Sequence, residues 1–207
     1  MTNDIKNIKI GIFGAKYSGK KSISLRYIKN EYTVGYIPTI EDVFEKTIQI
    51  DNENIHISLI NTDGQDDFGE MRNIYYRQSQ GFIFVLDIMN EDSIEYLKTI
   101  YNDIISCVDD KNNINCVLAA NKSDLRDDNR SDIISVDEYN SLEKYFKCKI
   151  FEVSSKTGMN IDNMFDYLIK QIISKQAKPN QTNKESPTNQ KTSKKKQSFW
   201  SKLFKRK

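Results

Sequence analysis

The chain has 207 residues, a length that suits one globular domain of ordinary size with an appendage. Its three cysteines are too few and too scattered for a disulfide framework, which indicates a reducing compartment. We expect no membrane-spanning helix, because no run of about 18 apolar residues occurs, and no signal peptide, because the first residues are polar. The net charge of +2 hides an asymmetry. Residues 176–207 hold ten lysines and arginines against one acidic residue, a net charge of +9, so the remainder carries −7.

The predicted elements alternate between strands and helices. Apolar and polar residues alternate over 8–13, which predicts a strand, and a glycine-bearing turn and a helical pattern that includes Ile23 and Tyr27 follow. Turn-forming residues at 51–54 separate two predicted strands, 44–50 and 55–61, and indicate a hairpin. Buried strands are then predicted at 81–87, 116–120 and 150–153, and helices at 92–107, 136–146 and 161–173.

This alternation implies crossover connections between parallel strands. We therefore predict an α/β fold with a mainly parallel, six-stranded sheet that carries helices on both faces. The helical pattern stops near Ser174, so the folded domain is expected over residues 1–175. Residues 176–193 are polar with no large apolar side chain, which predicts a disordered linker. Residues 194–207 form a basic and aromatic tail.

The turn between the first strand and the first helix has the spacing of a phosphate-binding loop. Its glycines permit a close approach of the backbone to phosphate, the helix N-terminus favours anions, and Lys20 supplies a positive charge. In isolation, an ordinary glycine-containing turn would look the same. The predicted nucleotide-binding residues here are Gly14, Ala15, Lys16, Tyr17, Ser18, Gly19, Lys20, Lys21 and Ser22.

The residue after Lys20 departs from the usual motif. A phosphate-binding loop continues with serine or threonine, whose hydroxyl coordinates Mg²⁺, but this chain has Lys21. Shifting the motif by one residue would make Ser22 the ligand. That shift would place Lys20 where a glycine is needed and would turn the apolar face of the helix away from the core. We therefore keep the first register, in which the hydroxyl ligand is missing.

Two later motifs indicate that the base is guanine. The first follows a buried strand and comprises Asn121, Lys122 and Asp124. The carboxylate of Asp124 can accept hydrogen bonds from N1–H and from the exocyclic amine of guanine, a pair of donors that adenine lacks. The second motif, which would give a backbone N–H to the guanine carbonyl and a lysine stem along the base, comprises Ser154, Ser155 and Lys156. The order of the motifs and their positions at strand ends favour a guanine-nucleotide site.

Together these motifs resemble those of the small GTPases of the Ras superfamily, over about residues 6–174. The resemblance implies a P-loop NTPase G domain that binds GTP and GDP. The segment Tyr-Ile-Pro-Thr-Ile-Glu-Asp at 36–42 resembles switch I of the Ras branch more closely than that of Rho, Rab or Arf proteins. The resemblance adds nucleotide-binding roles for Tyr32, which would pack against the base, for Tyr36, and for Thr39, which would sense Mg²⁺ and the γ-phosphate.

The segment Asn-Thr-Asp-Gly-Gln at 61–65 falls where the family has Asp-Thr-Ala-Gly-Gln. By this resemblance, Gly64 would donate its N–H to the γ-phosphate. Gln65 would orient the attacking water and is the predicted catalytic residue.

Four departures from the family pattern surround the phosphates. Lys21 replaces the hydroxyl ligand, Asn61 replaces the aspartate that holds Mg²⁺ through water, Asp63 replaces alanine, and Lys16 replaces glycine. Mg²⁺ prefers anionic oxygen ligands, so we expect it to be bound weakly or not at all, with lysine charge in its place. Asp63 could pair with Lys21. Alternatively, Thr39 and Asp63 rebuild an ordinary Mg²⁺ site. Weak metal binding would slow GTP hydrolysis.

The resemblance places an effector surface on the strand that follows switch I, at Ile40, Glu41 and Asp42. An edge strand can accept a partner's strand, and its acids would meet basic residues. A solvated acidic edge is the alternative. We expect Ras-type effectors, with an exchange factor and an activating protein as further partners. We expect no nucleic acid partner and a monomer.

The tail can form a short amphipathic helix whose apolar residues insert into an anionic membrane while its cations contact lipid head groups. We expect no prenylation, because no cysteine lies near the end of the sequence, and no myristoylation, because it begins with Met-Thr. A calmodulin target, a nuclear-import signal and a solvated tail are the alternatives. The predicted membrane residues are Lys194, Lys195, Lys196, Phe199, Trp200, Leu203, Phe204, Lys205, Arg206 and Lys207.

We therefore predict a Ras-like guanine-nucleotide switch in intracellular signalling that hydrolyses GTP slowly. It would be cytoplasmic and peripheral on the inner face of the plasma membrane. The alternatives are a non-catalytic pseudo-GTPase scaffold and a membrane- or calmodulin-binding adaptor with a vestigial fold.

Overall fold

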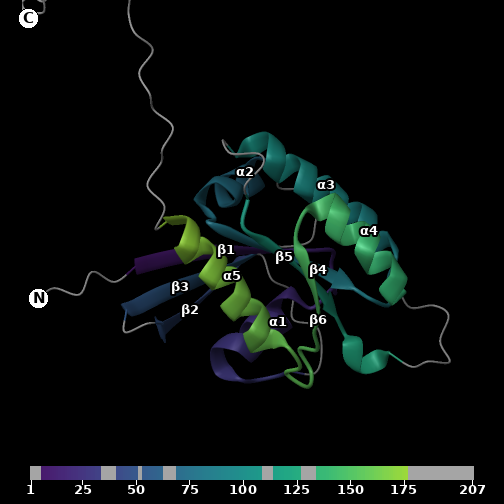
Figure 1. Ribbon diagram of the computed structural model, residues 1–207, viewed down its shortest axis with the longest axis horizontal. Coiled ribbons are helices and arrows are strands. Elements are labelled where there is room, and N and C mark those ends of the chain that lie inside the picture. Colours follow the sequence, from purple (N-terminus) through teal and green to yellow (C-terminus); the bar gives the residue numbers. More distant parts are fainter. Residues whose placement is uncertain are drawn as a thin grey trace, which may run out of the picture. The chain divides into compact units, whose positions relative to one another are not determined.

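The computed structural model describes residues 6–33, 41–50, 53–62, 69–108, 114–126 and 134–176, with backbone alone at 41, 62 and 69–71. Its described residues form a sheet of six strands in the order β2-β3-β1-β4-β5-β6 (Figure 1). The strands are β1 (Lys6–Phe13), β2 (Glu41–Ile50), β3 (Glu53–Thr62), β4 (Gly81–Asp87), β5 (Cys116–Asn121) and β6 (Lys149–Glu152). The β2–β3 pair is antiparallel and the other pairs are parallel, so the predicted α/β class and hairpin are confirmed.

Helices cover both faces of the sheet, as predicted. They are α1 (Lys20–Lys29), α2 (Gly69–Gln78), α3 (Asp92–Cys107), α4 (Val136–Phe146) and α5 (Ile161–Gln176). On one face, α1 and α5 bury Ile23, Tyr27 and Phe165 against the sheet. On the other, α2, α3 and α4 bury Tyr76, Ile100 and Phe146.

The stacked rings of Tyr27 and Phe165 join α1 to α5, with their centroids 3.8 Å apart. Burial raises the pKa of the Tyr27 phenol, and the carboxylates of Asp166 and Asp162 add to that shift. The phenol therefore stays neutral, and α1, which begins at the phosphate-binding loop, rests on a fixed aromatic contact.

The predicted elements differ from the structure mainly at α2. The sequence pattern predicts no helix at this position, and the structure has one over Gly69–Gln78. Among its described side chains only Tyr76 is fully buried, so the segment lacks the repeated apolar spacing that predicts a helix. In addition, β2 begins three residues before its predicted start, and α5 continues to Gln176.

Outer backbone groups of the edge strand β6 are already hydrogen-bonded within the fold. At β6, the Glu143 carboxylate accepts the N–H of Ile150 at 2.9 Å, and Asn160 donates its side-chain amide to the carbonyl of Glu152 at 2.9 Å. An added strand would need those same positions. The β6 edge is therefore poorly suited to strand addition, and the effector surface is predicted at the other edge strand, β2.

Two predictions about the rest of the chain lie outside the described residues. These are the greater part of the linker at 176–193 and the whole tail at 194–207. A search of the described helices finds none that is long and apolar enough to cross a bilayer.

Candidate nucleotide-binding site

The loops that follow β1, β5 and β6 meet at the carboxyl edge of the parallel strands, where α/β proteins bind ligands. Asn121, the last residue of β5, links these loops. Its side-chain amide donates to the Ser18 carbonyl at 2.9 Å, and its Oδ1 accepts the N–H of Ser155 at 3.1 Å. The side chain is fully buried. Asn121 therefore positions the phosphate-binding loop against the base-side loop.

Two glycines give the phosphate-binding loop its shape. A Cβ on Gly14 would lie 2.5 Å from the Val85 carbonyl oxygen, so a side chain there would push the loop off the sheet. Gly19 has a φ of 96° and caps α1, and a Cβ there would collide with the Asn121 amide. The helix begins at Lys20 with Ile23 and Tyr27 buried, which is the register that the sequence analysis retains.

Lys20 folds back over the loop. Its ammonium donates to the carbonyls of Gly14 at 2.9 Å and Ala15 at 3.0 Å, and the residue is only 9% exposed. A buried ammonium held by carbonyls, beside the first N–H groups of a helix, is prepared to receive an anion.

The base-side residues are already tied to one another. Ser154 donates to Oδ1 of Asp124 at 2.6 Å, and the Lys156 ammonium lies 3.6 Å from Oδ2. Lys122 donates to Asp87 at the end of β4, with 2.6 Å between Nζ and Oδ2. These contacts hold the Asp124 carboxylate in place, with 13% of its side chain exposed.

A third group of residues surrounds the start of α1. The Lys21 ammonium lies 2.8 Å from a carboxylate oxygen of Asp42, at the beginning of β2. Asp42 pairs in register with Asn61 at the end of β3. Ser24, one turn along α1 from Lys21, donates to Oδ1 of Asn61 at 3.1 Å. The described residues offer no partner to the buried Asn61 amide nitrogen.

Comparison with known proteins decides the family. A family model described as the Ras family matches residues 9–174. The chain belongs to the Ras family. It is 30% identical over 177 residues to Ras-like protein rasB of Dictyostelium discoideum, which covers 86% of this chain and 88% of that protein. It is also 30% identical over 168 residues to a Ras-like protein of Laccaria bicolor, which covers 81% of this chain and 78% of that protein.

Ras-family membership makes the chain a GTP-binding small GTPase with a P-loop NTPase fold, as the motifs predict. Its described side chains nevertheless do not suit the metal that the family implies. At the two positions where the family pattern has a hydroxyl and a carboxylate, this chain presents the Lys21 ammonium and the Asn61 amide. Neither supplies an anionic oxygen to Mg²⁺. Among the described residues, no three His, Cys, Asp or Glu side chains are grouped to hold a metal.

The remaining predicted site residues of this Ras-family chain fall into two sets. Lys16 lies 5.4 Å from the ring of Tyr17, which is 57% exposed, and both follow Gly14 in the phosphate-binding loop. Ser22 lies half-buried in the first turn of α1, and Tyr32 is exposed beyond the end of that helix. Glu41 begins β2, and its backbone alone is described. Predicted residues outside the described ranges are Tyr36, Thr39, Ile40, Asp63, Gly64 and Gln65.

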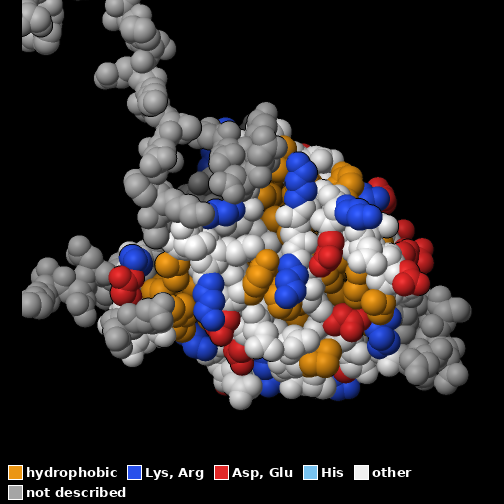
Figure 2. Space-filling model, in the orientation of Figure 1, with side chains coloured by type: hydrophobic (Ala, Val, Ile, Leu, Met, Phe, Trp, Pro, Cys, Tyr) orange, Lys and Arg blue, Asp and Glu red, His pale blue; other side chains and the backbone are white. Residues whose placement is uncertain are grey.

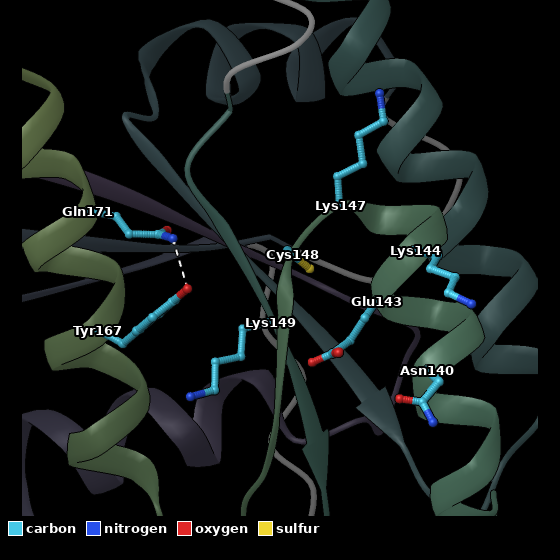
Figure 3. Close-up of a pocket in the computed structure, with 8 residues that line it drawn as sticks. All are labelled: Asn140, Glu143, Lys144, Lys147, Cys148, Lys149, Tyr167 and Gln171. Atoms are coloured by element: carbon cyan, nitrogen blue, oxygen red, sulfur yellow. Dashed lines mark hydrogen bonds between the residues drawn. The ribbon is translucent and has the colours of Figure 1, made fainter.

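A separate hollow of about 600 Å³ lies near the amino end of β6, between α4 and α5 (Figure 3). Its lining includes Lys144, Lys147, Lys149 and Tyr167, and none of the predicted nucleotide-binding residues. Strand β6 runs from this hollow toward the loop at 154–156. The hollow therefore lies at the amino ends of the parallel strands, and the nucleotide site lies at their carboxyl ends. Among the described residues on the face shown in Figure 2, basic and acidic side chains are interspersed.

Two residues that help to shape the site, Arg26 and Asp87, are not among those predicted from the sequence. Arg26 donates to the carbonyls of Ser155 at 3.0 Å and Lys156 at 2.7 Å, which ties α1 to the base-side loop. No sequence pattern connects residues about 130 positions apart in this way. Asp87, by contrast, had a signal, because it is an acidic residue that directly follows a buried apolar strand at the carboxyl edge of the sheet.

Proposed function

We propose that the chain is a GTP/GDP-dependent signalling switch that retains its nucleotide with little help from Mg²⁺ and hydrolyses GTP slowly. One observation carries the proposal: the Lys21 ammonium, paired with Asp42 at 2.8 Å, occupies the first turn of α1 where the family pattern has a metal-binding hydroxyl. Asn61 adds an amide where the pattern has a carboxylate.

Electrostatics explains how these substitutions support one another. Mg²⁺ binding in the family pattern needs anionic oxygens, and this chain has lost one carboxylate there and gained a cation. Besides the usual Lys20, the chain has Lys21 and Lys16 in or next to the phosphate-binding loop, so fixed positive charge replaces part of the charge that a metal would bring. A lysine attracts the phosphates but does not reproduce the geometry with which a metal stabilises the transferring phosphoryl group. Binding is therefore expected to be preserved better than hydrolysis.

The test of metal dependence is an affinity measurement. The full chain is stripped of nucleotide, and GDP binding is titrated with Mg²⁺ present and again in excess chelator. We expect the two dissociation constants to agree within a few-fold. A large loss of affinity on chelation would contradict the proposal and would favour a Mg²⁺ site rebuilt from Thr39 and Asp63.

The test of turnover is a single-turnover measurement of GTP hydrolysis beside an ordinary Ras protein under identical conditions. We expect a lower rate, and a rate equal to that of the Ras protein would contradict slow hydrolysis. Chromatography of nucleotide bound to the purified chain separates the alternatives. GDP indicates turnover, GTP indicates a non-catalytic scaffold, and the absence of both favours an adaptor.

We further propose that effectors with basic surfaces bind along β2, and that an exchange factor and an activating protein act on the switch. The outward side of β2 carries Val43, which is 51% exposed, and Glu45. The net charge of −7 on residues 1–175 supports a basic partner. Exchange of Val43 for lysine should weaken effector binding, measured by titration, without changing GDP affinity.

For the tail, we propose attachment to the anionic cytoplasmic leaflet of the plasma membrane. The proposal rests on the net charge of +9 in residues 176–207 and on the aromatic residues Phe199, Trp200 and Phe204. Full-length protein should sediment with liposomes that contain phosphatidylserine but not with neutral ones. Acidic substitutions at Ser198 and Ser201 should release it. Equal binding to both kinds of liposome, or tighter binding to calmodulin than to liposomes, would contradict membrane attachment.

A further inference from the structure

Asp42 faces the start of α1 rather than the outer side of the sheet. Along β2, the half-buried positions are Asp42, Phe44, Lys46, Ile48 and Ile50, and the three apolar ones pack against the core shared with α1 and α5. Asp42 lies on this inner face and reaches Lys21 at 2.8 Å. The side chains of Lys21 and Asp42 are 29% and 33% exposed, so solvent weakens the ion pair but does not separate the two groups.

The first turn of α1 has an excess of positive charge for Asp42 to offset. It holds Lys20 and Lys21 and no acidic residue, and the helix N-terminus is itself positive. Lys20 is satisfied by carbonyls of the phosphate-binding loop. The ammonium of Lys21 instead reaches a carboxylate on another strand. The same end of the helix is where phosphate groups bind in a P-loop fold.

The ion pair can open without detaching β2 from α1. Four residues along β2 from Asp42, the Lys46 ammonium donates to the Tyr27 carbonyl at 2.8 Å and lies 4.4 Å from the centre of the Tyr27 ring. Phe44 and Ile48 add apolar contact on the same face. Lys21 is therefore able to change its anionic partner while the strand stays in place.

We propose that Asp42 is a built-in competitor of the nucleotide's phosphates for Lys21, and so a residue that sets nucleotide affinity. In the absence of nucleotide, the carboxylate of Asp42 holds the Lys21 ammonium. When the diphosphate arrives, Lys21 exchanges Asp42 for phosphate oxygens. Part of the attraction between Lys21 and the phosphates is thus offset by the ion pair that has to open. This inference rests on the proposed function, because it takes Lys21 as a phosphate-binding cation.

The experiment measures GDP affinity for four forms of the full chain: wild type, Asp42→Asn, Lys21→Met and the double variant. Removing the competing charge with Asp42→Asn should tighten GDP binding by roughly two- to fivefold, the range expected for a partly exposed ion pair. Lys21→Met should weaken binding. In the Lys21→Met background, the Asp42→Asn exchange should leave the affinity unchanged, because the cation for which Asp42 competes is gone.

Glu45→Gln is the matched control. Glu45 lies on the same strand but on the outer side, with a carboxylate oxygen 3.5 Å from Nε2 of His56. This variant removes the same charge and should leave GDP affinity unchanged. Equal tightening in Asp42→Asn and Glu45→Gln would overturn the proposal, since it would show a general effect of charge. So would an Asp42→Asn variant that binds GDP no more tightly than wild type, or tightening that persists without Lys21.

All affinities are measured with Mg²⁺ and with chelator, which separates this inference from the proposed function. If wild type loses GDP in chelator, the proposed metal independence is wrong. The ratios of variant to wild-type dissociation constants measured with Mg²⁺ then still test whether Asp42 competes for Lys21. If wild type keeps GDP in chelator but Asp42→Asn binds GDP no more tightly than wild type, the proposed function stands and the proposed competition by Asp42 is wrong.

Discussion

The two sides of the nucleotide site differ in how closely they follow the Ras-family pattern. On the base side, Asn121, Lys122 and Asp124 stand in the expected order, and each is held by a hydrogen bond from or to another loop or strand. On the phosphate side, Lys21 and Asn61 depart from the pattern, and their contacts lead to Asp42 and Ser24 on neighbouring elements.

We interpret this difference as a separation between recognition of the base and management of phosphate charge. Guanine is identified by two hydrogen bonds to one carboxylate, and no other side chain type accepts both in the same way. Charge on the phosphates can be balanced by a metal, by lysines or by helix N–H groups. The part of the site with a unique chemical solution keeps its residues, and the part with several solutions has changed.

The largest expected effect comes from breaking the base side. In Asp124→Asn, the predicted acceptor of two hydrogen bonds from guanine loses its charge, and one of its two atoms becomes a donor. GDP affinity should fall by roughly 100-fold or more. Titration with GDP and with IDP, which lacks the exocyclic amine, should show that the preference of wild type for GDP has shrunk.

Glu95→Gln on α3 is the control for this experiment, since Glu95 is an exposed acid that pairs only locally with Lys98 among the contacts described. It should bind GDP as wild type does. An Asp124→Asn variant that still distinguishes GDP from IDP would mean that the base is recognised elsewhere.

Much of the fold could be predicted because its elements follow simple periodicities. The strand Gly81–Asp87 and the helices Asp92–Cys107 and Val136–Phe146 begin and end at the predicted residues, since each has a clear apolar pattern of its own period. The helix Gly69–Gln78 was missed because it contributes little to the core, so its sequence carries little apolar pattern.

The site could be predicted where it depends on local motifs, and not where it depends on distant contacts. Glycines at 14 and 19 are required by the loop itself, and the structure gives each a steric reason. The sequence does not identify Asp42 as the partner of Lys21, because Asp63 is the partner it suggests and Asp42 belongs to the predicted effector surface. Which face of β2 an acid occupies depends on the strand's register with β3, and a single residue of slip reverses it.

Restoring the family's residues at positions 21 and 61 should restore dependence on Mg²⁺. The double variant Lys21→Ser with Asn61→Asp returns a hydroxyl and a carboxylate to the metal position. We expect GDP affinity to become dependent on Mg²⁺, with a loss of roughly 10- to 100-fold on chelation. The parallel titration of wild type, with its few-fold change, is the reference. If chelation leaves the double variant unaffected, these two positions do not explain the difference between the two sides.

The smallest expected effect concerns backbone strain in the phosphate-binding loop. Tyr17 has a φ of 66°, a left-handed conformation that costs a residue with a Cβ about 1–2 kcal/mol and costs glycine almost nothing. The variants Tyr17→Gly and Tyr17→Ala both remove the ring, so the difference between them isolates the backbone. The glycine variant should be more stable by about 1 kcal/mol, which is roughly 2–4 °C in melting temperature for a chain of this length. At Thr99, an exposed position within α3, the order should reverse, because glycine destabilises a helix interior relative to alanine.

Lys122, with a φ of 69°, carries the same strain on the base side. Equal melting temperatures for the two Tyr17 variants, beside a clear glycine advantage for the same pair of exchanges at Lys122, would mean that only the base side holds its backbone rigidly.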